Sequence, residues 1–226
     1  IKKTGIKVVG KDVLPATGEL SANILKEKLL GQKSEFIPCI EEKIPARPPV
    51  MCPGCPHRGM FYVLKKLKLT VSGDIGCYTL GALPPLESMD TCICMGASIG
   101  MAHGMEKAGG KEFAGKTVAV IGDSTFIHSG ITGLIDIVYN KGTSTVIILD
   151  NSITGMTGHQ HNPTSGYTIK GEPAKQVDLI KLAHAIGIER VKVADPYDIK
   201  EFEKVVKEEI SADEPSVIIA KRPCAL

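Results

Sequence analysis

Two short β-branched runs flank a helical stripe in the middle of the chain. Residues 117–121 and 144–149 are apolar throughout, as expected for parallel strands buried on both faces. Between them, apolar residues recur at three- and four-residue steps, as on a helix that covers a sheet; they are Ile127, Ile131, Leu134, Ile135 and Val138. The pattern predicts a βαβ unit with a helix over 126–139 and a right-handed crossover.

Weaker patterns on both sides extend this unit. They predict further strands at 69–71, 190–194 and 217–220, and helices at 95–107, 177–186 and 198–210. Residues 155–171 show no periodicity and many Gly, Thr, His and Pro residues, which indicates a long loop of the kind used for function. The expected fold class is α/β: a doubly wound, mostly parallel sheet with helices on both faces.

The first 45 residues contain too few apolar positions to build a core. A strand at 6–10 and a helix at 21–30 capped by Ser21 are expected there, followed by a connector at 31–49 rich in proline and charge. We therefore expect residues 1–45 to be a connector or the remnant of a preceding domain, and 46–226 to be the main domain. The chain opens at Ile1 within a Lys-rich run, which fits a fragment of a longer protein, with a natural short subunit as the alternative.

Composition excludes several classes of protein. The chain has 226 residues, 43% of them hydrophobic, and a formal net charge of +2 with the Lys and Arg residues scattered, which argues against nucleic acid as a partner. No apolar run is long enough to cross a bilayer and no signal peptide opens the chain, so we expect no membrane association. Seven cysteines do not suggest a secreted disulfide framework; a reducing cytoplasm fits better.

Polar residues stand where the two central strands end. Gly122-Asp123-Ser124 follows the first strand and Asn151 follows the second, at the edge where parallel sheets bind ligands. This arrangement resembles the diphosphate motif of thiamine-diphosphate enzymes. A diphosphate needs backbone N–H groups at a helix start and a divalent cation, and Mg²⁺ prefers oxygen ligands such as those of Asp123 and Asn151. An ordinary strand-end turn is the alternative, since Gly-Asp-Ser alone is common.

Four of the cysteines are expected at the same edge. Cys52 and Cys55 lie two residues apart on a Pro-Gly turn, a spacing shared by zinc, iron–sulfur and redox dithiol sites. Cys77 and Cys224 each follow a predicted strand, so a parallel sheet would bring all four thiols together. The other three, Cys39, Cys92 and Cys94, are expected as small apolar residues in buried positions.

The histidines leave more than one interpretation open. His57 and His103 lie near predicted strand ends and are the catalytic candidates, although each fits a structural role equally well. His128 falls on the first turn after the Asp123 loop. His159 and His161 belong to the long loop, where they would contact a substrate carboxylate or remain solvated.

Five ordered segments resemble the 2-oxoacid:ferredoxin oxidoreductases, and most closely the thiamine-diphosphate domain of the indolepyruvate-specific α subunits. They are CPGCPHR, GDIGCYTLGALPPLESMDTCICMGASIGMAHG, GDSTFIHSG, DNSITGMTGHQ and KRPC, spread over residues 45–226. The resemblance implies a set of cofactor-binding residues: Gly122, Asp123, Ser124, Thr125, Asn151, Gly155, Met156 and Thr157. The chain departs from the family pattern at Ser124, where a second glycine is usual.

The resemblance also implies the metal sites. Asp123, Asn151 and the backbone carbonyl of Ile153 would hold Mg²⁺ with thiamine diphosphate. A [4Fe-4S] cluster would be held by the four cysteines Cys52, Cys55, Cys77 and Cys224.

By the same resemblance, the expected activity is CoA-dependent oxidative decarboxylation of a 2-oxoacid, an arylpyruvate such as indolepyruvate, with ferredoxin as electron acceptor. Family members add a pyrimidine-binding domain, and we expect that domain, a second subunit and an oligomeric assembly as partners. Two alternatives remain: a non-oxidative thiamine-diphosphate-dependent decarboxylase, and a zinc-bound α/β interaction module without catalysis.

Overall fold

The computed structural model describes residues 4–33 and 45–226, which fall into two units that divide between Arg47 and Pro48. In the first unit, helix α1 (Ala22–Leu30) is capped by Ser21, whose Oγ accepts a hydrogen bond of 3.4 Å from the backbone N–H of Ile24, as predicted. The prediction of a strand at 6–10 was wrong. Residues 6–9 are exposed and residue 10 is half-buried, and none of them pairs with a strand in the described part of the chain; an unpaired strand is not stable.

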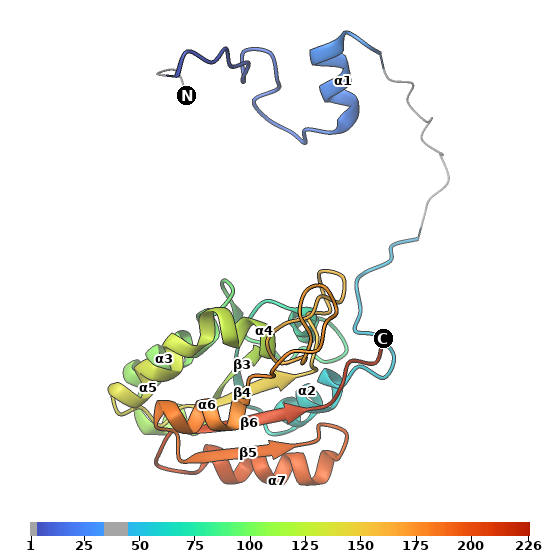
Figure 1. The fold of residues 1–226 in the computed structure, drawn as a ribbon. Helices are drawn as coiled ribbons and strands as arrows, with labels where there is room; N and C mark the ends of the chain where they lie inside the picture. The colour runs from blue at the N-terminus through green and yellow to red at the C-terminus, as the bar shows by residue number, and fades with distance from the viewer. Residues whose placement is uncertain (1–3, 34–44) are drawn as a thin grey trace. The chain divides into compact units, whose positions relative to one another are not determined.

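The second unit is built on a sheet of six parallel strands in the order β2-β1-β3-β4-β6-β5 (Figure 1). The strands are β1 (Thr70–Gly73), β2 (Thr91–Cys92), β3 (Thr117–Gly122), β4 (Thr145–Asp150), β5 (Arg190–Ala194) and β6 (Ser216–Lys221). The predicted fold class is therefore confirmed, and β5 lies where the sequence placed it.

Helices cover both faces of this sheet. The longer ones are α2 (His57–Lys66), α3 (Ala97–Ala114), α5 (Ile131–Tyr139), α6 (Leu179–Ile186) and α7 (Ile199–Ile210). Helices α2 and α7 share one core with one face of the sheet, whereas α3, α5 and α6 pack on the other face (Figure 1).

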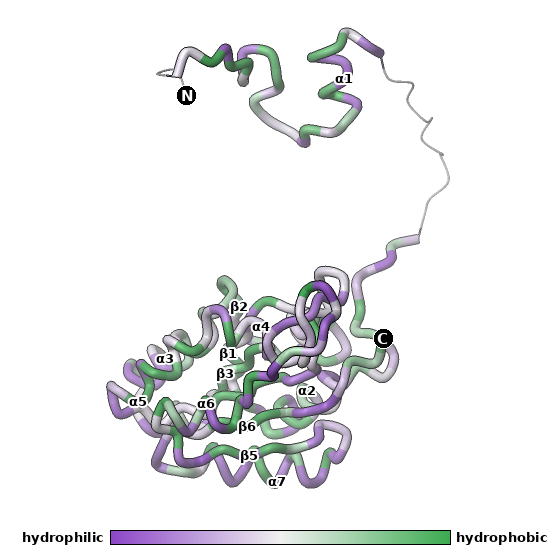
Figure 2. The backbone as a smooth tube through the Cα atoms, in the orientation of Figure 1, coloured by the Kyte–Doolittle hydropathy of each residue, from purple (hydrophilic) through white to green (hydrophobic). Residues whose placement is uncertain are grey.

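Strand β3 shows how the sequence builds both cores. Val118 and Val120 point toward α2 and α7, and Ala119 and Ile121 point toward α3 and α5. All four side chains are fully buried. In Figure 2 the tube is coloured as hydrophobic along the central strands. A strand covered on both faces must be apolar at every position, which explains the continuous runs in the sequence.

The predicted helix at 126–139 is less regular than its stripe suggests. The chain leaves β3 through one turn, α4 (Asp123–Thr125), continues as a π-helical turn over Phe126–Gly130, and only then becomes α5. Such π-helical turns often occur at functional sites. Helix α3 extends past its predicted end to Ala114 and is kinked at Gly110, where φ is 75°.

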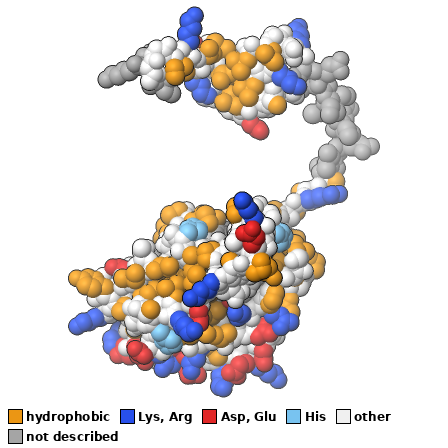
Figure 3. Space-filling view, viewed as in Figure 1, with side chains coloured by type: hydrophobic (Ala, Val, Ile, Leu, Met, Phe, Trp, Pro, Cys, Tyr) orange, Lys and Arg blue, Asp and Glu red, His pale blue; other side chains and the backbone are white. Residues whose placement is uncertain are grey.

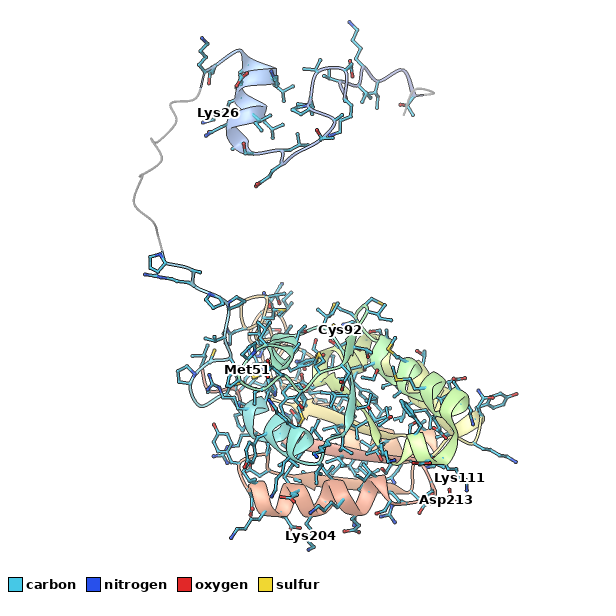
Figure 4. The ribbon with its side chains drawn as sticks, turned by 180° about the vertical axis from the view of Figure 1, so that it is seen from behind. Lys26, Met51, Cys92, Lys111, Lys204 and Asp213 are labelled. Carbon is cyan, nitrogen blue, oxygen red and sulfur yellow. The ribbon has the colours of Figure 1, made fainter. Side chains whose placement is uncertain are left out.

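The two ends of the sheet have different surfaces. The carboxyl ends of the strands face the long loop that follows β4, seen above the sheet in Figure 1. At the opposite end Lys111 and Asp213 form an ion pair of 2.6 Å and lie side by side in Figure 4. Charged side chains gather along α7 in Figure 3, and hydrophobic ones over the face with α3 and α5. No helix in the described ranges is long and apolar enough to span a membrane.

Candidate functional site

A cavity of about 190 Å³ lies at the carboxyl edge of the sheet, between the ends of β3 and β4. Its lining includes the eight cofactor-binding residues predicted above, namely Gly122, Asp123, Ser124, Thr125, Asn151, Gly155, Met156 and Thr157. Ile153, the predicted source of a carbonyl ligand, lines it too, as do His57, Cys77 and Tyr78. Residues far apart in the sequence thus meet in one place because adjacent parallel strands end together.

Asp123 is the buried acid of this cavity, with only 3% of its surface exposed. The backbone N–H of Ser124 donates to its Oδ1 at 2.7 Å, and the Thr164 hydroxyl lies 2.8 Å from its Oδ2. Burial raises the pKa of Asp123 from 3.8 to about 6, and the nearby charge of Asp150 adds to the rise. A buried carboxylate without a cationic partner is costly, so the site suits a bound divalent cation.

Asn151 begins the opposite wall. Its Oδ1 accepts a hydrogen bond of 3.4 Å from the N–H of Ile153, which folds the chain back over the cavity. Its carbonyl accepts a bond of 3.2 Å from the N–H of Cys224, so the end of the chain is fastened to the same strand end. Amide and carbonyl oxygens complete a set of hard donors suited to Mg²⁺.

Tyr78 is a part of the site that the sequence did not reveal. Its buried hydroxyl donates to the carbonyl of Ile75 at 3.1 Å and accepts from the N–H of Gly122 at 3.0 Å, and burial raises its pKa. A Cβ on Gly76 or Gly122 would lie 2.3 or 2.9 Å from the Tyr78 ring, so both glycines make room for it. The N–H of Gly122 is therefore engaged by Tyr78 rather than free for a phosphate.

Only one of the two candidate histidines reaches the cavity. His57 is 5% exposed and meets the Tyr78 ring edge-on with a centroid distance of 5.9 Å. Burial lowers the pKa of His57 to about 4, so its imidazole is neutral near pH 7.

His103 lies at the other end of the sheet. It is packed against Gly142, in the loop that precedes β4, and its Nδ1 is 3.4 Å from Oε2 of Glu106. The structure therefore does not bring His103 to the cavity, and its helical position in α3 explains this: the helix runs away from the carboxyl edge.

The four cysteines Cys52, Cys55, Cys77 and Cys224 lie near one another, and Cys77 lines the cavity. Burial raises the pKa of the Cys55 thiol, and the charges of the other three thiols raise it further. Cys77 responds in the same way to burial and to Cys224 and Cys52. Within the described ranges, however, no three or more His, Cys, Asp or Glu side chains are clustered tightly enough to hold one metal ion.

The remaining cysteines differ from expectation where they can be described. Cys92 and Cys94 are exposed, not buried, because the strand that carries Cys92 is the short edge strand of the sheet. Cys39 lies outside the described residues. The histidines His128, His159 and His161 are exposed, and none of them lines the cavity.

Asp74 is a second buried carboxylate that the sequence did not single out. It accepts hydrogen bonds from the N–H groups of Gly96 and Ser98 at 2.8 and 3.1 Å, so it caps the start of α3. A carboxylate at a helix N-terminus is electrostatically favourable. Asp74 therefore fixes the start of α3, just after Met95 of the cavity lining, and its place in Gly-Asp-Ile-Gly gave no sign of this.

Comparison with known proteins agrees with this geometry. Residues 74–220 match the family described as the C-terminal TPP-binding domain of thiamine pyrophosphate enzymes. The chain is 39% identical to indolepyruvate oxidoreductase subunit IorA of Pyrococcus horikoshii over 98% of its length and 38% of that protein. It is 44% identical to the Archaeoglobus fulgidus protein of the same name over 81% of its length and 30% of that protein.

Solved structures show the same fold. The 2-oxoglutarate:ferredoxin oxidoreductase of Magnetococcus marinus superposes with a TM-score of 0.66 at 20% identity, over 79% of this chain and 65% of that one. The thiamine diphosphate-dependent 4-hydroxybenzoylformate decarboxylase of Rhodococcus jostii superposes with a TM-score of 0.56 at 17% identity, over 85% and 36%. With its cavity at the strand ends and a family match over most of its second unit, the chain belongs to the thiamine pyrophosphate enzymes, as their C-terminal TPP-binding domain.

Proposed function

We propose that the cavity binds the diphosphate part of thiamine diphosphate through Mg²⁺. Asp123 and Asn151 would supply side-chain oxygens and Ile153 its backbone carbonyl. The observation that carries this proposal is the meeting of all three residues in one cavity, with a buried carboxylate that has no cationic partner among the described residues. Gly155, Met156 and Thr157 form the loop that would cover the cofactor on the side of Asn151.

The cavity is smaller than a complete cofactor site. Its 190 Å³ falls below the 300–1,000 Å³ typical of ligand pockets, so another surface must cover the rest of the cofactor. We infer that a pyrimidine-binding domain and a second subunit of an oligomeric enzyme supply that surface. When bound, the cofactor would stabilise the negative charge left by decarboxylation. The chain would orient it through Asp123 and Asn151, and His57 would face it as a neutral hydrogen-bonding group.

The gathered cysteines support a [4Fe-4S] cluster. Around one zinc ion, with Zn–S bonds near 2.3 Å, four sulfurs would lie about 3.8 Å apart. In a cluster each thiolate binds its own iron, so the sulfurs lie farther apart. The effect of the neighbouring thiols on the pKa values of Cys55 and Cys77 indicates that the four cysteines lie near one another, and four cysteines are the ligand set that such a cluster needs. Cys77 lines the cofactor cavity and would place the cluster beside it.

The activity proposed for the whole protein is oxidative decarboxylation of a 2-oxoacid, with CoA as acyl acceptor and ferredoxin as electron acceptor. The chain spans less than two fifths of its P. horikoshii relative, whose name supports an arylpyruvate such as indolepyruvate as substrate. The M. marinus structure, described with 2-oxoglutarate, coenzyme A and succinyl-CoA bound, supports the reaction type. We place the enzyme in the cytoplasm, where a reducing environment preserves free thiols.

Two other functions fit the structure less well. A non-oxidative decarboxylase would share the fold of the R. jostii enzyme, yet it has no use for four thiols gathered beside the cofactor cavity. In a zinc-bound interaction module, the buried carboxylate of Asp123 would have no function.

One preparation separates the three. Protein purified without oxygen is assayed for thiamine diphosphate, iron, sulfide and zinc. Iron and sulfide in equal amounts, with retained cofactor, support the oxidoreductase. Cofactor without iron supports the decarboxylase, and zinc without cofactor supports the interaction module.

A further inference from the structure

A tyrosine ties the Cys52–Cys55 turn to a distant loop. Tyr197, between β5 and α7, donates a hydrogen bond from its hydroxyl to the carbonyl of Gly54, in the middle of that turn. Gly54 has φ of 71°, a left-handed conformation that glycine adopts without strain. The turn itself is exposed at Pro53 and Gly54, and burial alone does not hold it.

The same tyrosine also contacts the segment that carries Cys224. The Arg222 guanidinium carbon lies 4.1 Å from the centroid of the Tyr197 ring. Its Nη1 pairs with Oδ2 of Asp195 at 2.7 Å, and Asp195 Oδ1 accepts from the Tyr197 N–H at 2.9 Å. Asp195, Tyr197 and Arg222 thus form a closed set of contacts, which we call the Tyr197 brace.

Backbone contacts fix both sides of the brace. The N–H of Arg222 donates to the carbonyl of Asp150 at 3.0 Å, which sets the terminal segment against the end of β4. On the other side, a Cβ on Gly59 would lie 2.1 Å from the carbonyl oxygen of Pro196, so helix α2 touches the brace loop directly. The brace therefore joins the segment before Cys224 to the turn and helix around Cys55.

We propose that Tyr197 and Arg222 are positioning residues that hold the Cys52–Cys55 turn against Cys224, so that the thiols are gathered before a metal binds. The proposal rests on the proposed iron–sulfur site but concerns the metal-free chain. Sites whose supporting side chains are locked in place bind metal with less reorganisation. Neither side chain contacts the cofactor cavity, so a change in the brace should leave cofactor binding intact.

The test measures the distance between thiols directly. In a chain with Cys39, Cys92 and Cys94 replaced by serine, the metal-free protein is treated with the short thiol cross-linker dibromobimane, and mass spectrometry follows cross-links from Cys224 to Cys52 or Cys55. Tyr197→Phe keeps the ring beneath Arg222 and loses only the hydroxyl. We expect it to slow the cross-link severalfold, and Tyr197→Ala or Arg222→Met to slow it further. Tyr139→Phe, on an exposed tyrosine of α5, is the matched control and should change nothing.

A second measurement separates this proposal from the cluster itself. In protein loaded with iron and sulfide without oxygen, Tyr197→Phe should lose iron to a chelator severalfold faster at unchanged affinity for thiamine diphosphate. If the parent chain binds no iron but cross-linking still depends on Tyr197, the cluster fails and the positioning role stands. If Tyr197→Phe, Tyr197→Ala and Arg222→Met all cross-link at the parent rate, the positioning role is overturned, whatever the iron content.

Discussion

The hydroxyl of Thr164 lies 2.8 Å from Oδ2 of Asp123 and 2.6 Å from Oδ1 of Asn162. A single hydroxyl proton can serve only one of these acceptors at a time. Thr164 belongs to the irregular loop that follows β4, so this loop is anchored on the carboxylate proposed to hold Mg²⁺. The order of this loop should therefore depend on whether Asp123 is protonated, ionised or bound to Mg²⁺.

We expect Thr164→Val to weaken Mg²⁺-dependent binding of thiamine diphosphate about tenfold or more, because a hydrogen bond to a charged group contributes about 1.5–3 kcal/mol. Thr164→Ser keeps the hydroxyl and should bind nearly as the parent chain does. Calorimetric titration measures the affinity, and limited proteolysis of the loop reports its order. Equal affinity in the valine variant would show that the bond has no part in binding.

Asp123→Ala and Asn151→Ala should each abolish Mg²⁺-dependent cofactor binding while the fold survives. Loss of an oxygen that binds the ion directly should cost several kcal/mol, by the scale of hydrogen bonds to charged groups, about 1.5–3 kcal/mol each. Asp213→Asn, at an exposed acid on the opposite end of the sheet, is the control. Unchanged affinity in either cavity variant, measured by calorimetry, removes the assignment of the site.

The pKa of Asp123 predicts a pH dependence with a definite sign. Its pKa rises from 3.8 to about 6 on folding, so the native state keeps this proton to higher pH than the unfolded chain does. Asp123 therefore contributes about 3 kcal/mol to the free energy of unfolding. This contribution is fully present below pH 3.8 and is lost as the pH rises through about 6. Denaturant titrations of the metal-free chain between pH 4 and 8 measure it.

The affinity for Mg²⁺ should rise with pH, whereas the stability contribution of Asp123 falls. Mg²⁺ needs the ionised carboxylate, so its affinity should fall about tenfold per unit as the pH drops below about 6. Asp123→Asn removes the buried charge and should raise the stability of the metal-free chain at pH 7 by up to about 3 kcal/mol. A metal affinity independent of pH between 5 and 7 contradicts the role given to Asp123.

Serine substitution separates the two groups of cysteines. Replacement of Cys52, Cys55, Cys77 or Cys224 should each remove the visible iron–sulfur absorbance of protein prepared without oxygen, because each thiolate holds one iron. Replacement of Cys39, Cys92 or Cys94 should leave the spectrum unchanged. Colourless parent protein that contains zinc would refute the electron-transfer role.

The 226-residue chain by itself should not turn over substrate. Its cavity covers only part of a cofactor, so it should bind thiamine diphosphate weakly and should not decarboxylate indolepyruvate or pyruvate with a viologen acceptor. Addition of the pyrimidine-binding domain and the second subunit should restore activity. Sustained turnover by the chain alone would indicate a self-contained decarboxylase instead.

The local sequence determined the sheet and the place of the cavity at its carboxyl edge. Residues 117–121 and 144–149 are apolar at every position, and only a strand buried on both faces demands this. Once those strands are parallel neighbours, Asp123 and Asn151 must meet at one edge. The same logic brought Cys77 and Cys224 toward Cys52 and Cys55, because each follows a strand of that sheet.

Tertiary structure alone decided the features that depend on contacts between distant segments. The Tyr78 hydroxyl accepts a hydrogen bond from the N–H of Gly122, and the hydroxyl of Thr164, in the long loop, bonds to Asp123. The Tyr197 hydroxyl donates to the carbonyl of Gly54. His103 faces the far end of the sheet because of where α3 runs, although its neighbours in the sequence suggested a strand end. Periodicity records whether a residue is buried, but which partner it meets depends on how loops of irregular backbone pack, and no local pattern encodes that.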